Sequence, residues 1–128
     1  MEVSKIQIKR GAVEIVLQLT STLTPQNIAG VLWRYNSNFD PQGKVGEFKP
    51  KQSSVQLGSL SAIKDCFFLL EGAVVSQNDD PPTAYQVLAS VLQDAVPVHK
   101  EVPPEGGAGS VGKEDAPFLY KFRIVEAT

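Results

Sequence analysis

The chain has 128 residues, of which 42% are hydrophobic and 20% are charged, a composition that excludes disordered, collagen-like and coiled-coil proteins. At this length roughly two thirds of the unfolded chain's surface can be buried, which is enough for a core without disulfides or metal ions. Residues 1–64 carry 8 Lys and Arg against 4 Asp and Glu (net +4), and residues 65–128 carry 4 against 10 (net −6), so neither half predicts nucleic-acid binding.

Alternation of apolar and polar residues predicts two strands near the start of the chain, over residues 6–9 and 12–20. The second reads as a half-buried strand. Because the Lys9-Arg10-Gly11 segment between them is short enough for a turn, we expect the two strands to pair as a hairpin. The face of residues 12–20 that we expect to be buried carries Val13, Ile15, Leu17 and Leu19.

Three further strands are predicted in the next part of the chain. Residues 28–35 are bounded by turn-forming segments, and Val31, Trp33 and Tyr35 line up at a period of two, so we expect these three side chains to face the core. The alternative is that Trp33 and Tyr35 form a platform on which a sugar stacks. Residues 45–49 and 54–60 are shorter strand candidates, separated by Pro50. Both are predicted to be edge strands.

The segment 63–76 is predicted to be a strand that is apolar on both faces. A strand of an antiparallel sandwich normally buries only one face. We therefore expect the second face to be covered, either by another segment of the chain or by another subunit. One face carries Cys66, Phe68, Leu70 and Val74, and the other carries Phe67, Leu69, Ala73 and Val75.

Residues 83–96 fit either a strand or a helix. Pro81-Pro82 is compatible with a helix start, but the strand is preferred because the other confident elements are strands. The Gly- and Pro-rich acidic segment at about 97–117 is predicted to be one long flexible loop, followed by a last strand over residues 118–125. About eight short strands predict an all-β, two-sheet antiparallel sandwich of the jelly-roll or immunoglobulin-like kind, and a helix at 83–96 would make it α+β.

The loop contains a glycine pattern that resembles nucleotide-binding motifs. Residues 107–113 read Gly-x-x-x-x-Gly-Lys, but Glu114 stands where a P-loop needs Ser or Thr to hold Mg²⁺. Both glycine motifs also need a preceding buried strand and a following helix, and only 11 residues remain after Pro117. Nucleotide binding is therefore not expected.

Few residues in the chain are suited to catalysis. His99 is the only histidine, and we expect it on the surface at the mouth of the loop, where a catalytic base would be poorly positioned. Cys66 is the only cysteine, so it forms no internal disulfide and is expected to be a core residue. The sequence predicts a non-enzymatic protein without a cofactor or a metal centre.

Nothing in the chain resembles a targeting or membrane-spanning segment. The longest apolar run, Cys66-Phe67-Phe68-Leu69-Leu70, has five residues, against about 20 for a membrane-spanning helix. The first ten residues lack the apolar block of a secretory signal, so a cytoplasmic location is expected.

Two functions from different classes follow from these patterns. The first is an interaction module that binds a second copy of itself or a partner protein through the segment 63–76, with Phe67, Leu69 and Val75 at the interface. The alternative is a lectin-like or Ca²⁺-dependent binder of a ligand such as a carbohydrate. Its site would form if loops 36–44 and 97–117 share one end of the sandwich, which would bring together Asn36, Asn38, Asp40, Glu114 and Asp115.

Overall fold

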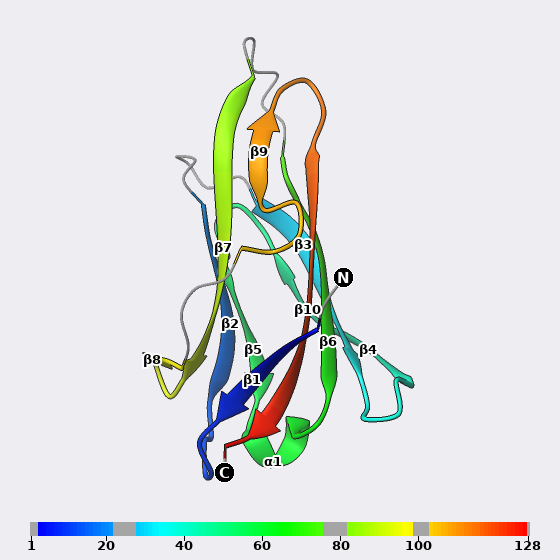
Figure 1. Ribbon diagram of the computed structural model, residues 1–128, viewed down its shortest axis with the longest axis vertical. Coiled ribbons are helices and arrows are strands. Elements are labelled where there is room, and N and C mark those ends of the chain that lie inside the picture. The colour runs from blue at the N-terminus through cyan, green and yellow to red at the C-terminus, as the bar shows by residue number, and fades with distance from the viewer. Residues whose placement is uncertain (1–2, 22–27, 76–81, 99–102, 128) are drawn as a thin grey trace.

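The structure is a computed structural model that describes residues 3–21, 28–75, 82–98 and 103–127. Two five-stranded sheets pack face to face, as predicted for an all-β sandwich (Figure 1). The one helix among the described residues, α1 (Leu60–Ile63), is a single turn, so no described helix is long enough to cross a membrane. The first sheet has the order β1 (Ser4–Ile8), β10 (Ala116–Glu126), β6 (Phe67–Val74), β3 (Ile28–Tyr35) and β4 (Pro41–Phe48). The second has the order β5 (Ser54–Gly58), β2 (Ile15–Ser21), β7 (Thr83–Gln93) and β8 (Val96–Pro97), and β9 (Ala108–Val111) also pairs with β7.

The core lies between the inner faces of the two sheets. Along most strands buried and less buried side chains alternate, as the pleat of a strand requires. Residues 83–93 are strand β7, which excludes the α+β alternative. The rings of Phe68 and Phe122 stack with their centroids 5.1 Å apart at the middle of the first sheet. The fully buried side chains include Ile8, Ile15, Leu17, Leu19, Leu32, Leu70, Val87, Val91 and Ile124.

The predicted hairpin between residues 6–9 and 12–20 is wrong. β1 lies parallel to β10 in the first sheet, with Ile6 opposite Ile124, whereas β2 belongs to the second sheet. The chain changes sheets between these strands, with Gly11 at a φ of +85° and Val13 73% exposed rather than buried. The alternation of apolar and polar residues shows which side chains share a face of a strand, but not which neighbouring strand it pairs with. Here β1 pairs with part of the open edge of β10.

The two edge-strand predictions are confirmed. β4 is the last strand of the first sheet and β5 is the first strand of the second. Gly43, Lys44 and two register shifts in the pairing with β3 make β4 an irregular edge. Irregular, charged edges discourage pairing with the edge of another sheet.

The segment 97–117 was predicted as one loop, but it contains a strand. β9 pairs with β7, and the backbone N–H of Val87 donates a 2.6 Å hydrogen bond to the carbonyl of Gly107. Glu105 and Leu119 exchange two backbone hydrogen bonds of 2.9 and 2.8 Å. This part of the chain therefore joins β7 of the second sheet to β10 of the first, and it closes one side of the sandwich (Figure 1).

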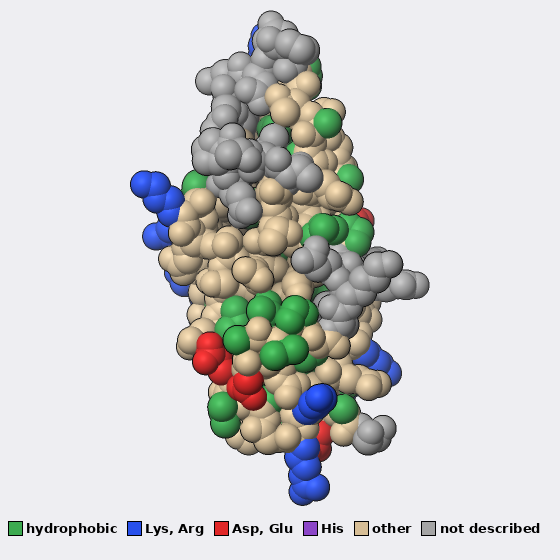
Figure 2. Space-filling view, turned by 90° about the vertical axis from the view of Figure 1, so that its left-hand side faces the viewer, with side chains coloured by type: hydrophobic (Ala, Val, Ile, Leu, Met, Phe, Trp, Pro, Cys, Tyr) green, Lys and Arg blue, Asp and Glu red, His purple; other side chains and the backbone are tan. Residues whose placement is uncertain are grey.

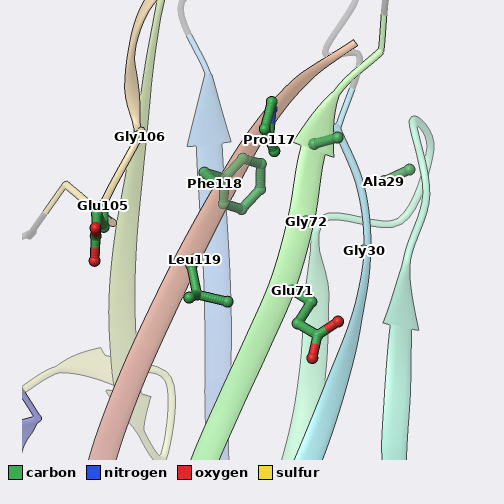
Figure 3. Close-up of a pocket in the computed structure, with 10 residues that line it drawn as sticks. Ala29, Gly30, Glu71, Gly72, Glu105, Gly106, Pro117, Phe118 and Leu119 are labelled. Carbon is green, nitrogen blue, oxygen red and sulfur yellow. The ribbon is translucent and has the colours of Figure 1, made fainter. Parts of the chain in front are cut away.

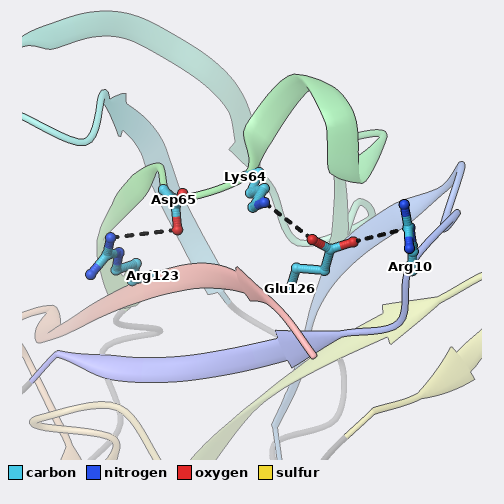
Figure 4. A network of polar contacts seen from close by, with 5 residues as sticks. All are labelled: Arg10, Lys64, Asp65, Arg123 and Glu126. Carbon is cyan, nitrogen blue, oxygen red and sulfur yellow. Dashed lines mark hydrogen bonds and ion pairs between the residues drawn. The ribbon is translucent and has the colours of Figure 1, made fainter. Parts of the chain in front are cut away.

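The predicted strand 63–76 begins later than expected. α1 ends at Ile63, Asp65 adopts a φ of +62°, and β6 starts only at Phe67. Two groups of ion pairs lie around this turn (Figure 4). Glu126 accepts a 3.1 Å contact from Lys64 and lies 3.8 Å from Arg10, and Arg123 lies 3.5 Å from Asp65. Because all of these groups are partly or fully exposed, they position the end of β10 more than they stabilise the fold.

Candidate functional site

The outer face of the first sheet carries a group of large apolar side chains. Leu32 is fully buried and faces the core, so its neighbours Trp33 and Tyr35 point outward, where they are only partly buried. The prediction that Val31, Trp33 and Tyr35 face the core is therefore wrong. The side chains of β3 that point away from the core are more apolar than those that point toward it. For that reason the apolar face of the alternating pattern is not the buried face of this strand. We call this surface the outer face: Val31, Trp33, Tyr35, Phe67, Leu69 and Leu119 with the residues between them.

The register of the strands makes this surface continuous. Trp33 lies opposite Leu69 on β6, and Leu69 lies opposite Lys121 on β10. In the next outward-facing row, Tyr35 lies opposite Phe67 and Phe67 opposite Arg123. Side chains opposite one another on adjacent strands are close enough to touch, so β3 and β6 form one apolar band, which Lys121 and Arg123 of β10 border.

One side chain of the β3–β4 turn folds onto this band. The Phe39 ring stacks on the Phe67 ring with centroids 4.0 Å apart, and the Arg123 guanidinium lies 5.1 Å from the centroid of Phe67. Phe39 has a φ of +64° and remains 59% exposed. Among the described residues, the second face of β6 is thus covered in part by the same chain, by Phe39 at its Phe67 end.

The opposite end of the outer face is hollow (Figure 3). Small residues line a depression of about 840 Å³ there, between β3, β6 and β10. Glu71 on β6 and Glu105 beyond β10 stand at its border, with Leu119 between them (Figure 3). The small residues are Ala29, Gly30, Gly72 and Ala73.

Both signs of charge occur on the outer face. Lys44 Nζ lies 2.6 Å from Glu47 Oε1, and this hydrogen bond and charge hold the pKa of Glu47 below its usual value. Within the described part of the chain, Glu71 and Lys121 make no ion pair, and Glu71 is exposed. A glutamate and a lysine on this face are therefore available to another molecule.

The other predicted interface residues can now be placed. Phe67 and Leu69 belong to the outer face, and Val75, just past the end of β6, is partly buried. The side of the molecule that carries β8 shows a hydrophobic area in its lower half (Figure 2). Val96 of β8 is 62% exposed. The outer residues of the second sheet include the polar Gln18, Thr20, Gln56 and Gln86 and the aliphatic Val16, Leu88 and Leu92. Within the described strands, the outward aromatic residues lie on the first sheet.

The five loop residues predicted as a ligand site are not brought together. Asn36, Asn38 and Asp40 follow β3, whose end at Tyr35 lies beside Phe67 of β6. Glu114 and Asp115 precede β10, whose first residue lies opposite Val74 at the other end of β6. Figure 1 places the β3–β4 and β9–β10 connections at opposite ends of the long axis. The two loops do not share one end because β9 carries the segment 97–117 along the molecule to the far end.

The three residues after β3 instead stabilise their own turn. Asn36 Oδ1 accepts hydrogen bonds from the backbone N–H groups of Asn38 (2.9 Å) and Asp40 (3.0 Å), and Asn36 Nδ2 donates to Asp40 Oδ2 (3.2 Å). Such bonds are typical of turn-forming Asn and Asp. The described residues include no group of three or more His, Cys, Asp or Glu side chains that could hold a metal ion.

The glycine motif does not have the context of a nucleotide site. Residues 108–111 form a strand, and the described residues after it continue to β10 without a helix. Phosphate binding by such motifs depends on the N-terminus of a helix. His99, the other residue considered for chemistry, lies outside the described residues.

Cys66 is buried, as predicted, at 8% exposure. Burial raises the pKa of its thiol, the Asp65 carboxylate raises it further, and the Arg34 guanidinium opposes both. A raised pKa lowers the thiolate fraction at any given pH below about 9, so the thiol should be unreactive. We expect a disulfide reagent at pH 8 to modify Cys66 at least about tenfold more slowly in the folded protein than in urea. Equal rates in the two conditions would contradict its placement in the core.

Comparison of the chain with protein-family models, with curated proteins and with solved structures finds no match.

Proposed function

We propose that the protein is a non-enzymatic interaction module that associates through the outer face of its first sheet, and that a second copy of the chain is the partner this face fits best. The observation that supports the proposal most directly is the band of aromatic and aliphatic side chains on the neighbouring strands β3 and β6. Among the described residues, Phe39 stacks on the sheet face that carries Trp33, Tyr35, Phe67 and Leu69, and Val3 lies at its border. Aromatic residues are enriched at protein interfaces, and contiguous apolar patches of this kind mark interaction sites.

A second copy is favoured by the mixture of charges. A surface that carries both Glu and Lys can satisfy both by binding itself, whereas a partner of one charge would leave half of them unpaired. On the outer face Glu47 and Glu71 accompany Lys5, Lys44, Lys121 and Arg123. Lys44 pairs with Glu47 and Arg123 with Asp65 of the same copy, so within the described residues Glu71, Lys5 and Lys121 are the charges that a second copy could pair.

The area of the outer face sets the expected strength of dimerisation. Five strands about 4.8 Å apart and about eight residues long cover a plane of roughly 20 by 26 Å. A face-to-face dimer would bury about 1,000 Å² over both copies, which is below the standard range of about 1,200–2,000 Å² and typical of weak interfaces. We therefore expect a dissociation constant of about 10–100 μM rather than an obligate dimer.

The test replaces one apolar side chain at the centre of the band. Leu69→Lys is expected to abolish dimer formation, because it places a charge among Trp33 and Phe67 when the face is covered. Sedimentation velocity from 5 μM to 1 mM would measure this. The matched control is Gln56→Lys, the same charge change at an exposed position on β5 of the other sheet, which should dimerise like the unmodified chain. An unmodified chain that stays monomeric at about 1 mM would overturn the proposal.

A further inference from the structure

We infer that the two copies pack about a two-fold axis that runs across the strands of the outer face, so that Glu71 of each copy meets Lys121 of the other. This inference rests on the proposed function and adds the arrangement of the dimer and the residues that specify it. A two-fold interface uses the same patch on both copies, so the patch must be complementary to itself. Both the shape and the charge of the outer face are complementary to themselves in one orientation of the axis.

The shape is graded along the strands. On β6 the outward residues run from Phe67 and Leu69 at one end to Ala73 at the other, and on β3 they run from Tyr35 and Trp33 to Ala29. The large side chains form a ridge, and the small ones lie at the depression shown in Figure 3. A two-fold axis across the strands reverses the strand direction and lays the ridge of one copy into the depression of the other. An axis parallel to the strands would set ridge against ridge and leave the two depressions facing each other.

The depression is shallow and is bounded on the outer face by small side chains. Gly30 and Gly72 lie opposite each other at inward positions of β3 and β6, between the buried pairs Ile28 and Leu32 and Leu70 and Val74. Their backbone contributes to the depression, and a Cβ atom on Gly72 would point toward the core, 2.5 Å from Cζ of Phe118. On the outer face the small side chains beside the depression are those of Ala29 and Ala73.

The charges select the same arrangement. Glu71 lies opposite Leu119 and Lys121 lies opposite Leu69, so the two charged residues are diagonal neighbours on adjacent strands, about 7–8 Å apart. Consider a two-fold axis that crosses the strands midway between the levels of Glu71 and Lys121. It places Glu71 of one copy at the level of Lys121 of the other, which brings Glu71 of each copy beside Lys121 of the other. An axis along the strands instead places Glu71 nearest its own counterpart and Lys121 nearest its own. Like charges enclosed in an interface are strongly unfavourable.

A charge-reversal cycle tests the arrangement. Glu71→Lys alone would set Lys against Lys in the dimer, and Lys121→Glu alone would set Glu against Glu, so each should weaken dimerisation at least tenfold at low salt. The double variant Glu71→Lys/Lys121→Glu restores opposite charges across the axis and should dimerise like the unmodified chain. Sedimentation equilibrium measures the three constants, and melting temperatures check that each variant is folded.

A crosslinking experiment gives an independent reading. In a Cys66→Ala background, a short bismaleimide should join a Glu71→Cys copy to a Lys121→Cys copy when the two are mixed at about 1 mM, and should join neither variant to itself. Crosslinking of each variant with itself would overturn the arrangement.

The outcomes separate this inference from the proposed function. If the unmodified chain dimerises and Leu69→Lys prevents it, but neither single charge reversal changes the constant, the arrangement is wrong and the function stands. If the unmodified chain is monomeric throughout, the proposed self-association fails, and the arrangement fails with it.

Discussion

Replacing Phe122 with alanine is expected to lower the free energy of unfolding by about 3–5 kcal/mol. Phe122 is fully buried in the last strand, and its ring stacks on the rings of Phe68, 5.1 Å away, and Tyr120, 5.3 Å away. It also lies at the level where β10 has β1 on one side and β6 on the other, opposite Ser4 and Phe68. The substitution removes an aromatic ring and leaves a cavity that three hydrogen-bonded strands cannot easily close.

Urea unfolding followed by tryptophan fluorescence measures this effect, since Trp33 is the only tryptophan. Small domains have total stabilities of about 5–15 kcal/mol, so the Phe122→Ala variant should unfold at a much lower urea concentration. Phe39→Ala is the matched control, because Phe39 is 59% exposed and its loss should cost about 1 kcal/mol or less. If the two variants lose similar stability, Phe122 does not occupy the centre of the core.

The sequence predicts the strands of this fold better than their partners. Alternation correctly identified Ile15, Leu17 and Leu19 as inward residues of β2, because this strand has an apolar face toward the core and a more polar face away from it. It also identified both edge strands, because Pro50 and Lys-rich, Gly-containing segments suit edges. It gave the wrong partner for β1, because pairing depends on which edge is open after the other strands have assembled.

The sequence predicts the part of the outer face that lies on β6, but not the part that lies on β3. Residues 63–76 showed an apolar surplus that one sheet face cannot bury, and the outer face of β6 carries it, as Phe67 and Leu69 demonstrate. The contributions of Trp33 and Tyr35 were missed because β3 is more apolar outside than inside. The signal that could have corrected this is Leu32, since it lies between Val31 and Trp33 and shares a face with Ile28, and both Leu32 and Ile28 are buried. Periodicity alone cannot show when the more apolar face of a strand is the one that points away from the core.

The second large effect on stability is expected in residues 103–107, the described segment before β9. The sequence predicts a flexible loop there, but the segment packs against β10. Gly106→Ala should destabilise the protein by about 2–4 kcal/mol, from two sources that add. Gly106 has a φ of +79°, which alanine adopts at a cost of about 1 kcal/mol. The new Cβ atom would also lie 2.6 Å from the carbonyl oxygen of Pro117, a backbone atom that can move only if β10 shifts.

A second glycine separates the two sources. Gly11 has a φ of +85°, close to that of Gly106, but a Cβ atom there would meet nothing within 4 Å. Gly11→Ala should therefore cost only the conformational part, about 1 kcal/mol. The difference between the two variants in urea unfolding measures the contact with Pro117 alone. A difference near zero would mean that residues 103–107 do not rest against β10. The hydrogen bonds of Glu105 to Leu119 and of Tyr85 to the carbonyl of Gly106 (2.9 Å) would then fail to close that side of the sandwich.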